Sequence, residues 1–186
     1  SDVAEIGDDA LSGDMISGGV LDAVSVDGLN GGPLAGFRNA IINGGFDIWQ
    51  RGVNFSTFNI SVADRWFVGT SSGPSSITIS RQSFTPGQTD VPGEPTYYLR
   101  IDQADNNTLT LQRVEDVRSF AGQEVTYSFW AKADAATTMT VFMSQYFGPS
   151  GSTTVSVATP SFSLTTSWQK FTHTVTLPSI SGKTIN

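Results

Sequence analysis

Apolar and polar residues alternate along two stretches in the second half of the chain. Between 124 and 133 the apolar or small positions are Val125, Tyr127, Phe129, Ala131 and Ala133, and the positions between them are Thr126, Ser128, Trp130 and Lys132. Between 170 and 177, Phe171, His173, Val175 and Leu177 alternate with Lys170, Thr172, Thr174 and Thr176. A period of two is typical of strands that turn one face to a core and the other to solvent or a partner.

Shorter apolar runs of the same kind lie between turn signals from Phe37 onward. The predicted strands are Arg38–Ile42, Phe46–Gln50, Arg65–Val68, Ser76–Gln82, Tyr97–Asp102, Thr108–Val114, Glu124–Ala133, Thr138–Tyr146 and Trp168–Leu177. Segments rich in Gly and Pro separate them, and a short helical turn is predicted at 115–120. This pattern favours an all-β fold, an antiparallel β-sandwich, and within that class we predict a jelly roll.

The first 36 residues differ from the rest in charge and composition. They hold seven Asp and Glu residues, no Lys or Arg and no aromatic residue, so the whole net charge of −7 lies there. We therefore divide the chain into an acidic, Gly-rich, extended arm at 1–36 and a β domain at 37–186.

The apolar residues of the arm are small and come in ones and twos between glycines and aspartates. A segment of this kind does not bury enough surface alone to offset its ordering entropy. One interpretation is a disordered acidic tail. The other is that the apolar residues become buried between three copies of the chain, which makes the following residues an interface: Leu11, Met15, Ile16, Val20, Leu21, Val24, Val26 and Leu29.

Composition also excludes several functions. There is no Cys and a single His, which rules out disulfide scaffolds, Cys nucleophiles and zinc sites built on thiolates or imidazoles. The net charge of −7 disfavours nucleic acid as a partner, and no apolar run is long enough for membrane insertion.

Candidate catalytic groups are few. Glu115 and Asp116 form a carboxylate pair of the kind that glycosidases use, but the neighbouring Arg113 and Arg118 favour surface ion pairs. His173 stands on the apolar face of its strand, where we interpret it as a core residue. No phosphate loop or nucleophile elbow is present, so we predict that the protein is not an enzyme.

Two sets of residues resemble bacteriophage proteins. The segment Leu11-Ser12-Gly13-Asp14-Met15-Ile16-Ser17-Gly18-Gly19 resembles the L-S-G-D-x-I-x-G-G element of phage tail fibres and neck or baseplate appendages, where it belongs to intertwined trimeric shafts. The blocks at 38–52, 63–67, 97–101, 122–132 and 168–171 are similar to a jelly-roll domain of phage tail-fibre proteins, which is itself like the carbohydrate-binding modules of glycoside hydrolases.

The resemblance implies a structural protein of the virion tail, a tail fibre or baseplate appendage. It would be a homotrimer that attaches to other phage tail or baseplate proteins through its arm and contributes to host attachment at cell-surface glycans. Two other functions stay open: a carbohydrate-binding module of a secreted glycoside hydrolase, and a decoration or packing protein of the virion that binds no ligand.

Aromatic residues on polar strand faces are the candidate glycan-binding groups. Sugar rings dock on flat aromatic rings while nearby polar groups bond the hydroxyls. The predicted site residues are Tyr98, Arg100, Trp130, Lys132 and Tyr146. If the strands of Tyr98 and Trp130 share a sheet, these residues line one surface; alternatively, Trp130 packs under a loop or against another subunit. Trp49 and Trp66 are predicted to be core residues.

Two further expectations come from the resemblance. Related modules hold a structural calcium near their first strand, and Asn43 and Asp47 match the opening of that motif; we expect no other cofactor. Domains of this kind also continue well past the segment matched by Leu177–Ile185. We therefore expect a longer fibre protein, or a neighbouring copy that supplies the remaining strands, because an open sandwich would expose its edges.

Overall fold

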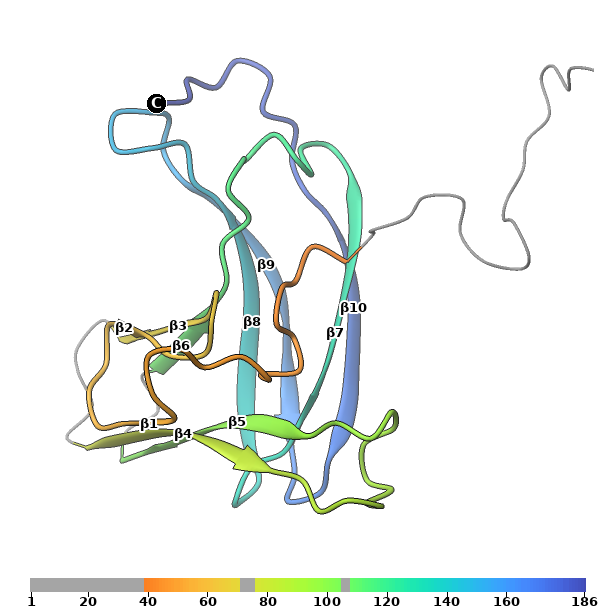
Figure 1. Ribbon diagram of the computed structural model, residues 1–186. Helices are drawn as coiled ribbons and strands as arrows, with labels where there is room; N and C mark the ends of the chain where they lie inside the picture. The colour runs from red at the N-terminus through yellow and green to blue at the C-terminus, as the bar shows by residue number, and fades with distance from the viewer. Residues whose placement is uncertain (1–38, 71–75, 105–107) are drawn as a thin grey trace, which may run out of the picture. The chain divides into compact units, whose positions relative to one another are not determined.

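The computed structural model describes residues 39–70, 76–104 and 108–186, and this part of the chain is all-β (Figure 1). All pairings between its strands are antiparallel, so the all-β, antiparallel part of the predicted fold is confirmed. The arm at 1–36, with its interface residues from Leu11 to Leu29, lies outside the described residues. Within the described ranges no helix is long and apolar enough to cross a membrane.

The first six strands are short and form two sheets. They are β1 (Asn54–Phe55), β2 (Ile60–Ser61), β3 (Phe67–Thr70), β4 (Ile77–Ser83), β5 (Tyr97–Gln103) and β6 (Thr108–Leu111). One sheet has the order β1-β4-β5 and the other the order β2-β3-β6. β4 and β5 pair along their whole length, from Ile77 opposite Gln103 to Ser83 opposite Tyr97.

A hydrophobic core joins these two sheets. Its buried members are Val62, Val68, Ile77 and Ile79, and partly buried side chains pack against them: Trp49, Phe55, Ile60, Trp66, Leu99 and Ile101. Burying an aliphatic side chain of this size contributes about 1.5–3 kcal/mol. The prediction that Trp49 and Trp66 are core residues is confirmed.

The predicted strands at 38–42 and 46–50 do not form over the described residues, because the carboxamide of Asn43 organises this segment instead. Its Nδ2 donates to the carbonyl oxygens of Ile48 (3.0 Å) and Asp64 (3.1 Å), and its Oδ1 accepts from the amide of Ile48 (3.0 Å). The indole of Trp66 donates to the carbonyl of Asn43 at 2.9 Å. Asn43 has a φ of 55°, which Asn tolerates better than most residues.

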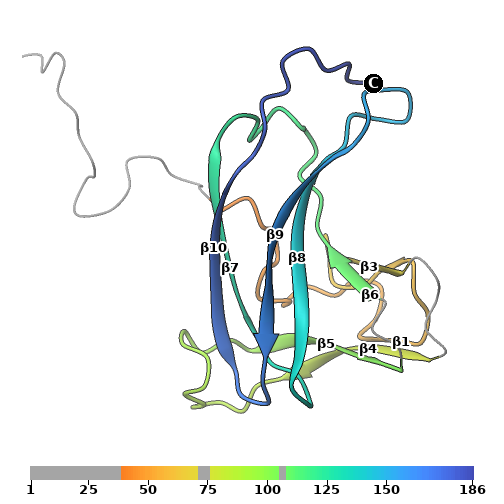
Figure 2. The ribbon, with the colours of Figure 1, turned by 180° about the vertical axis from the view of Figure 1, so that it is seen from behind.

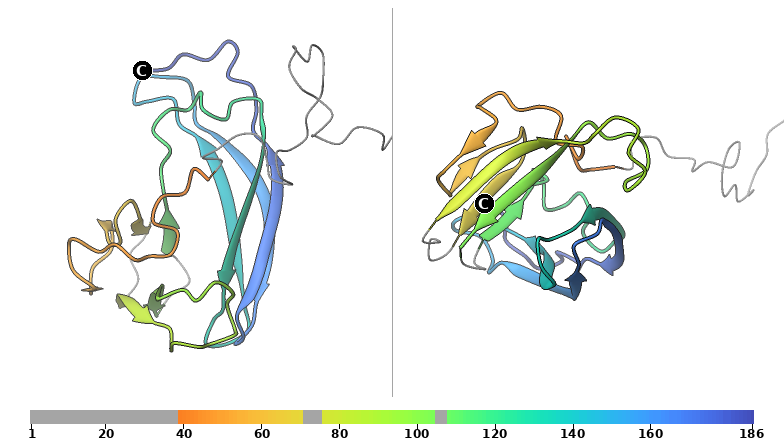
Figure 3. Two further views of the ribbon diagram at one scale, coloured as in Figure 1. Left: turned by 45° about the vertical axis from the view of Figure 1, so that its right-hand side comes forward. Right: turned by 90° about the horizontal axis from the view of Figure 1, so that it is seen from below.

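The last four strands are longer: β7 (Glu124–Ala131), β8 (Thr137–Gln145), β9 (Val155–Leu164) and β10 (Gln169–Thr176). β7 pairs with β10. The two strands that lie between them in the sequence, β8 and β9, pair with each other. Figures 1 and 2, which view the molecule from opposite sides, show these four strands running alongside one another. Figure 3 shows β4 and β5 crossing near one end of the four strands.

Aromatic rings connect the two strand pairs. Phe129 of β7 lies 5.6 Å from Phe162 of β9 and 5.5 Å from Phe171 of β10, measured between ring centroids. The apolar face of β7 and β10 alternates with an exposed face along both strands, as the pattern predicts.

β9 is a strand that the sequence analysis missed, because Pro160 in its middle cannot donate a ladder hydrogen bond. The ladder with β8 accommodates it by a shift of register: Thr140 lies opposite Ser161, whereas Phe142 lies opposite Ala158. β3 begins two residues later than predicted, since Arg65 has a φ of 74° and Trp66 closes a turn to the carbonyl of Ala63 (2.9 Å).

The predicted helical turn at 115–120 is a series of turns, and no helix occurs in the described part of the chain. Successive bonds run from the amide of Ser119 to the carbonyl of Asp116 (3.0 Å) and from Ala121 to Arg118 (3.3 Å). The described strands form four small sheets, and the jelly-roll arrangement stays a prediction.

Candidate functional site

Three aromatic side chains meet where β5 approaches the start of β10. We call Phe84, Tyr98 and Trp168 the Trp168 cluster. The ring centroids of Phe84 and Tyr98 are 4.9 Å apart, and each lies 5.2 Å from the centroid of Trp168. All three residues are half-buried. Tilted and edge-to-face pairs such as these contribute about 0.5–1.5 kcal/mol each beyond area burial.

The β4–β5 hairpin places two of these rings. Tyr98 lies opposite Gln82, and the amide of Phe84 bonds to the carbonyl of Thr96 at 2.9 Å, which continues the pairing past the ends of the strands. Phe84 and Tyr98 are therefore diagonal neighbours on one face of the hairpin, within reach for large side chains.

Charged groups surround the cluster. The Nζ of Lys132 lies 5.4 Å from the ring centroid of Trp168, a cation–π geometry. Arg100 reaches from β5 with its Nη2 at 3.1 Å from Asp134 Oδ2 and 3.4 Å from Asp102 Oδ2. These exposed ion pairs add little stability, but the pair of Arg100 with Asp134 connects β5 with the loop that follows β7.

The structure brings Tyr98, Arg100 and Lys132 together by a route that the sequence analysis did not foresee. The strands of Tyr98 and Trp130 do not share a sheet, so that condition for a common surface is not met: β5 belongs to the β1-β4-β5 sheet, whereas β7 pairs with β10. Trp168 makes the connection instead. Trp130 lies on the same face of β7 as Lys132, half-buried and opposite Lys170 of β10.

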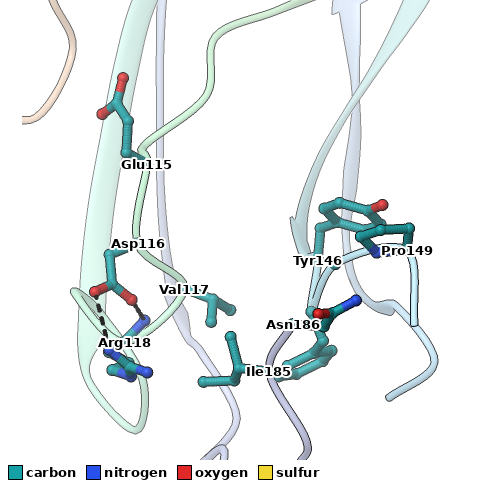
Figure 4. A pocket seen from close by; sticks show the side chains of 10 residues that line it. Glu115, Asp116, Val117, Arg118, Tyr146, Pro149, Ile185 and Asn186 are labelled. Carbon is teal, nitrogen blue, oxygen red and sulfur yellow. Dashed lines mark hydrogen bonds and ion pairs between the residues drawn. The ribbon is translucent and has the colours of Figure 1, made fainter. Parts of the chain in front are cut away.

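Tyr146 lies apart from the other four predicted residues. It follows the end of β8, is 61% exposed, and lines a pocket of about 410 Å³ that also includes Pro149 and Asn186 (Figure 4). Asp116 and Arg118 line this pocket too and form an ion pair at 3.6 Å.

The carboxylate pair at 115–116 is divided between two arginines. Glu115 pairs with Arg65, and the hydrogen bond from this guanidinium is the main reason that the pKa of Glu115 is lowered. Asp116 pairs with Arg118, as the sequence predicted, and Figure 4 shows the two carboxylates pointing apart. Arg113 instead lies with its guanidinium carbon 5.7 Å from the ring centroid of Phe67.

His173 is half-buried on the apolar face of β10, with the centroid of its ring 5.7 Å from that of Tyr127.

Asn43 and Asp47, the predicted calcium ligands, do not fit a calcium site as they are placed. The carboxamide of Asn43 is already used in three hydrogen bonds within its loop. Among the residues that the structure describes, no group of three or more His, Asp or Glu side chains could hold a metal ion. Calcium takes six to eight oxygen ligands.

Sequence reasoning missed Trp168 and Phe84 as site residues. Trp168 has the same parity as Lys170, so extending the alternation of β10 by two residues would have placed it on the polar face. No comparable signal exists for Phe84, whose position beside Tyr98 depends on the hairpin register.

Comparisons with known protein families, with curated proteins and with solved structures found no match to this chain.

Proposed function

We propose that this protein is a non-enzymatic structural component of a bacteriophage tail, a tail fibre or baseplate appendage, whose β domain binds host-surface glycans at the Trp168 cluster. The virion location and the trimeric arm rest on the resemblance of residues 11–19 to phage shaft elements. The glycan-binding part rests on one observation: half-buried aromatic residues from two strand systems meet at Trp168, with Lys132 over its ring and the Arg100–Asp134 ion pair two residues along the chain from Tyr98 and Lys132.

The chemistry of the cluster suits a sugar. The C–H face of a pyranose ring packs on an aromatic ring, and cationic and carboxylate groups around the rings bond the hydroxyls. The aromatic contact is limited to three half-buried residues, so each copy would bind weakly. Three copies on one particle gain avidity without new contacts, which makes weak binding sufficient for adhesion.

A jelly-roll organisation is part of this proposal. The β3–β6 pair encloses β4–β5 in the sequence, and the β7–β10 pair encloses β8–β9. Nested antiparallel pairs are the pattern produced when a jelly roll folds a long hairpin over itself. The separate ion pairs of Glu115 and Asp116 support a role without catalysis, because neither carboxylate is placed across a shared substrate position from the other.

Glycan-array binding of the purified full chain tests the proposal. We expect binding to a subset of host-surface glycans, and we expect Trp168→Ala to weaken it about tenfold or more, as loss of a central aromatic anchor does. Phe142→Ala is the matched control, because Phe142 is an exposed aromatic of β8 outside the cluster and its loss should leave binding unchanged. Equal binding by the Trp168→Ala variant and the wild type, or no binding to any host glycan, would overturn the glycan role and favour a ligand-free virion component.

A further inference from the structure

The exposed face of the β7–β10 pair forms a continuous polar surface that contains two tryptophans. We call it the outer face. Ladder partners directly across from each other share it: Thr126 with Thr174, Ser128 with Thr172, and Trp130 with Lys170. The hydroxyl oxygens of Thr126 and Thr174 are 2.8 Å apart, which confirms that these side chains lie on one side.

The same face continues beyond the ladder to Lys132 and Trp168. Their positions follow the two-residue period of β7 and β10, and the Nζ of Lys132 lies over the Trp168 ring at 5.4 Å. The face therefore has two neighbouring rows, and each row has one tryptophan and one lysine on different strands. The first row is Trp130 with Lys170, and the second is Lys132 with Trp168. Equivalent rows are about 7 Å apart, since they are two residues along a strand.

The lysines of the outer face have no carboxylate partner. Within the described ranges, the carboxylates that form ion pairs do so with arginines, and neither Lys132 nor Lys170 makes an ion pair. Both lysines are exposed. The nearest cation of the Trp168 cluster, Arg100, is paired with Asp102 and Asp134. The net charge of −7 lies in the first 36 residues and the rest of the chain is neutral overall, so the two unpaired lysines beside the tryptophans give this face a local positive charge.

We infer that the outer face binds a linear acidic polysaccharide, with Trp130 and Trp168 against successive sugar faces and Lys132 and Lys170 on its anionic groups. This inference rests on the proposed glycan function and names the ligand class. Charge complementarity selects the anionic polymer, and the Ser and Thr hydroxyls of the same face supply hydrogen bonds to sugar hydroxyls. The face follows the strands as far as Trp168, where Phe84 and Tyr98 pack against that ring, and its elongated form suits an extended chain.

Binding of the full-length protein to three immobilised polymers tests this inference: polygalacturonate for carboxylates, dextran sulfate for sulfates, and unmodified dextran as the neutral probe. We expect binding to one or both acidic polymers and none to dextran. Raising NaCl from about 0.05 to 0.5 M should weaken binding at least about fivefold, because salt screens exposed charges. Which acidic polymer binds distinguishes carboxylate from sulfate recognition.

The decisive variant is Lys132→Met combined with Lys170→Met, which keeps an unbranched side chain one atom shorter and removes both charges. We expect at least about a tenfold loss of affinity for the acidic polymer. Lys183→Met is the charge control: it removes one of the three lysine charges away from the outer face, where Lys183 lies near Phe147, and it should bind as the wild type does. Thermal unfolding checks that each variant is folded.

The outcomes separate this inference from the proposed function. If dextran binds as well as the acidic polymers, or if the double lysine variant retains binding while Trp168→Ala loses it, the acidic specificity is wrong and the glycan role stands. If Lys183→Met weakens binding as much as the double variant, the effect is one of overall charge and the inference fails. If no polymer or arrayed glycan binds, the proposed function itself fails.

Discussion

At the scale of single residues, Asn43 connects segments that no β-ladder joins. Its side chain bonds to the backbone of Ile48 and Asp64, and its carbonyl accepts from the indole of Trp66, which packs on the core. The polar groups of one loop residue thus fix the approach of the chain to β1 and β3. Gln50 adds to this arrangement through its amide, which bonds to the carboxylate of Asp64 at 3.2 Å.

Asn43→Ala should destabilise the β domain by about 2–3 kcal/mol. The change removes three hydrogen bonds of about 0.5–1.5 kcal/mol each and places Ala at a φ of 55°, which Ala adopts less readily than Asn. Urea unfolding followed by tryptophan fluorescence measures the loss. Asn54→Ala is the control, because Asn54 is exposed on β1; equal midpoints for the two variants would contradict this role of Asn43.

Glu115 gives a prediction about pH. Its pKa is lowered, chiefly by the hydrogen bond from Arg65, so the folded protein keeps this carboxylate ionised to lower pH than the unfolded chain does. The ion pair is therefore fully formed above the usual pKa of a glutamate and is lost only as pH falls through the lowered value. An NMR titration of the Glu115 carboxyl carbon should show this midpoint, and Arg65→Met should move it upward, whereas Arg118→Met should not. A midpoint unaffected by Arg65→Met would rule out the guanidinium as the cause.

At the scale of elements, the loop between β8 and β9 holds the segment at 184–186. The amide of Asn186 bonds to the carbonyl of Phe147 (2.9 Å), and that of Ser152 bonds to the carbonyl of Thr184 (2.9 Å). Gly148 and Gly151 allow this approach. A Cβ on Gly148 would collide with the carbonyl oxygen of Asn186, and one on Gly151 would collide with that of Phe147.

Gly151→Ala should separate this segment from the loop. A methyl group there would also lie 2.8 Å from the carbonyl oxygen of Thr184, so the backbone must shift, at a cost of about 1–3 kcal/mol. We expect a lower unfolding midpoint and faster hydrogen exchange at the amides of Ser152 and Asn186. Gly44→Ala should change neither, because a methyl group at Gly44 meets only the Ile41 side chain at 3.4 Å. Unchanged exchange in Gly151→Ala would show that the loop does not hold the segment.

The elements also show what the sequence could predict. β7 and β10 were predicted to within two residues, because a two-residue period with one exposed face follows directly from strand geometry. β9 was missed, since Pro160 is compatible with a strand interior only at a sheet edge or a bulge, and both depend on how the strand is paired. The pairing of Trp130 with Lys170 follows from local pattern plus register, whereas the meeting of Tyr98 with Trp168 depends on how separate sheets pack.

At the scale of the whole molecule, the proposed function places adhesion and assembly in different parts of the chain. The β domain carries the aromatic and cationic groups, and the acidic arm carries isolated apolar residues that are predicted to be buried only between copies. Assembly then determines adhesion, because a weak site becomes useful when several copies face one surface. Avidity of linked sites exceeds the single-site affinity by factors of about 10²–10⁴.

Light scattering of the purified full chain should therefore give three times the 19.8 kDa chain mass. Replacing Leu11 and Ile16 together by Asp should yield monomers, because two charges would enter a predicted apolar interface in an arm that already carries −7. The variant should keep the unfolding midpoint of the β domain and lose surface adhesion by the avidity factor, while its affinity for a short soluble glycan stays unchanged. A monomeric wild type at micromolar concentration would refute the trimeric arm. If the double variant were still trimeric, the subunit interface would instead lie in the β domain. The Trp130 side of the β7–β10 pair would then be the first surface to test.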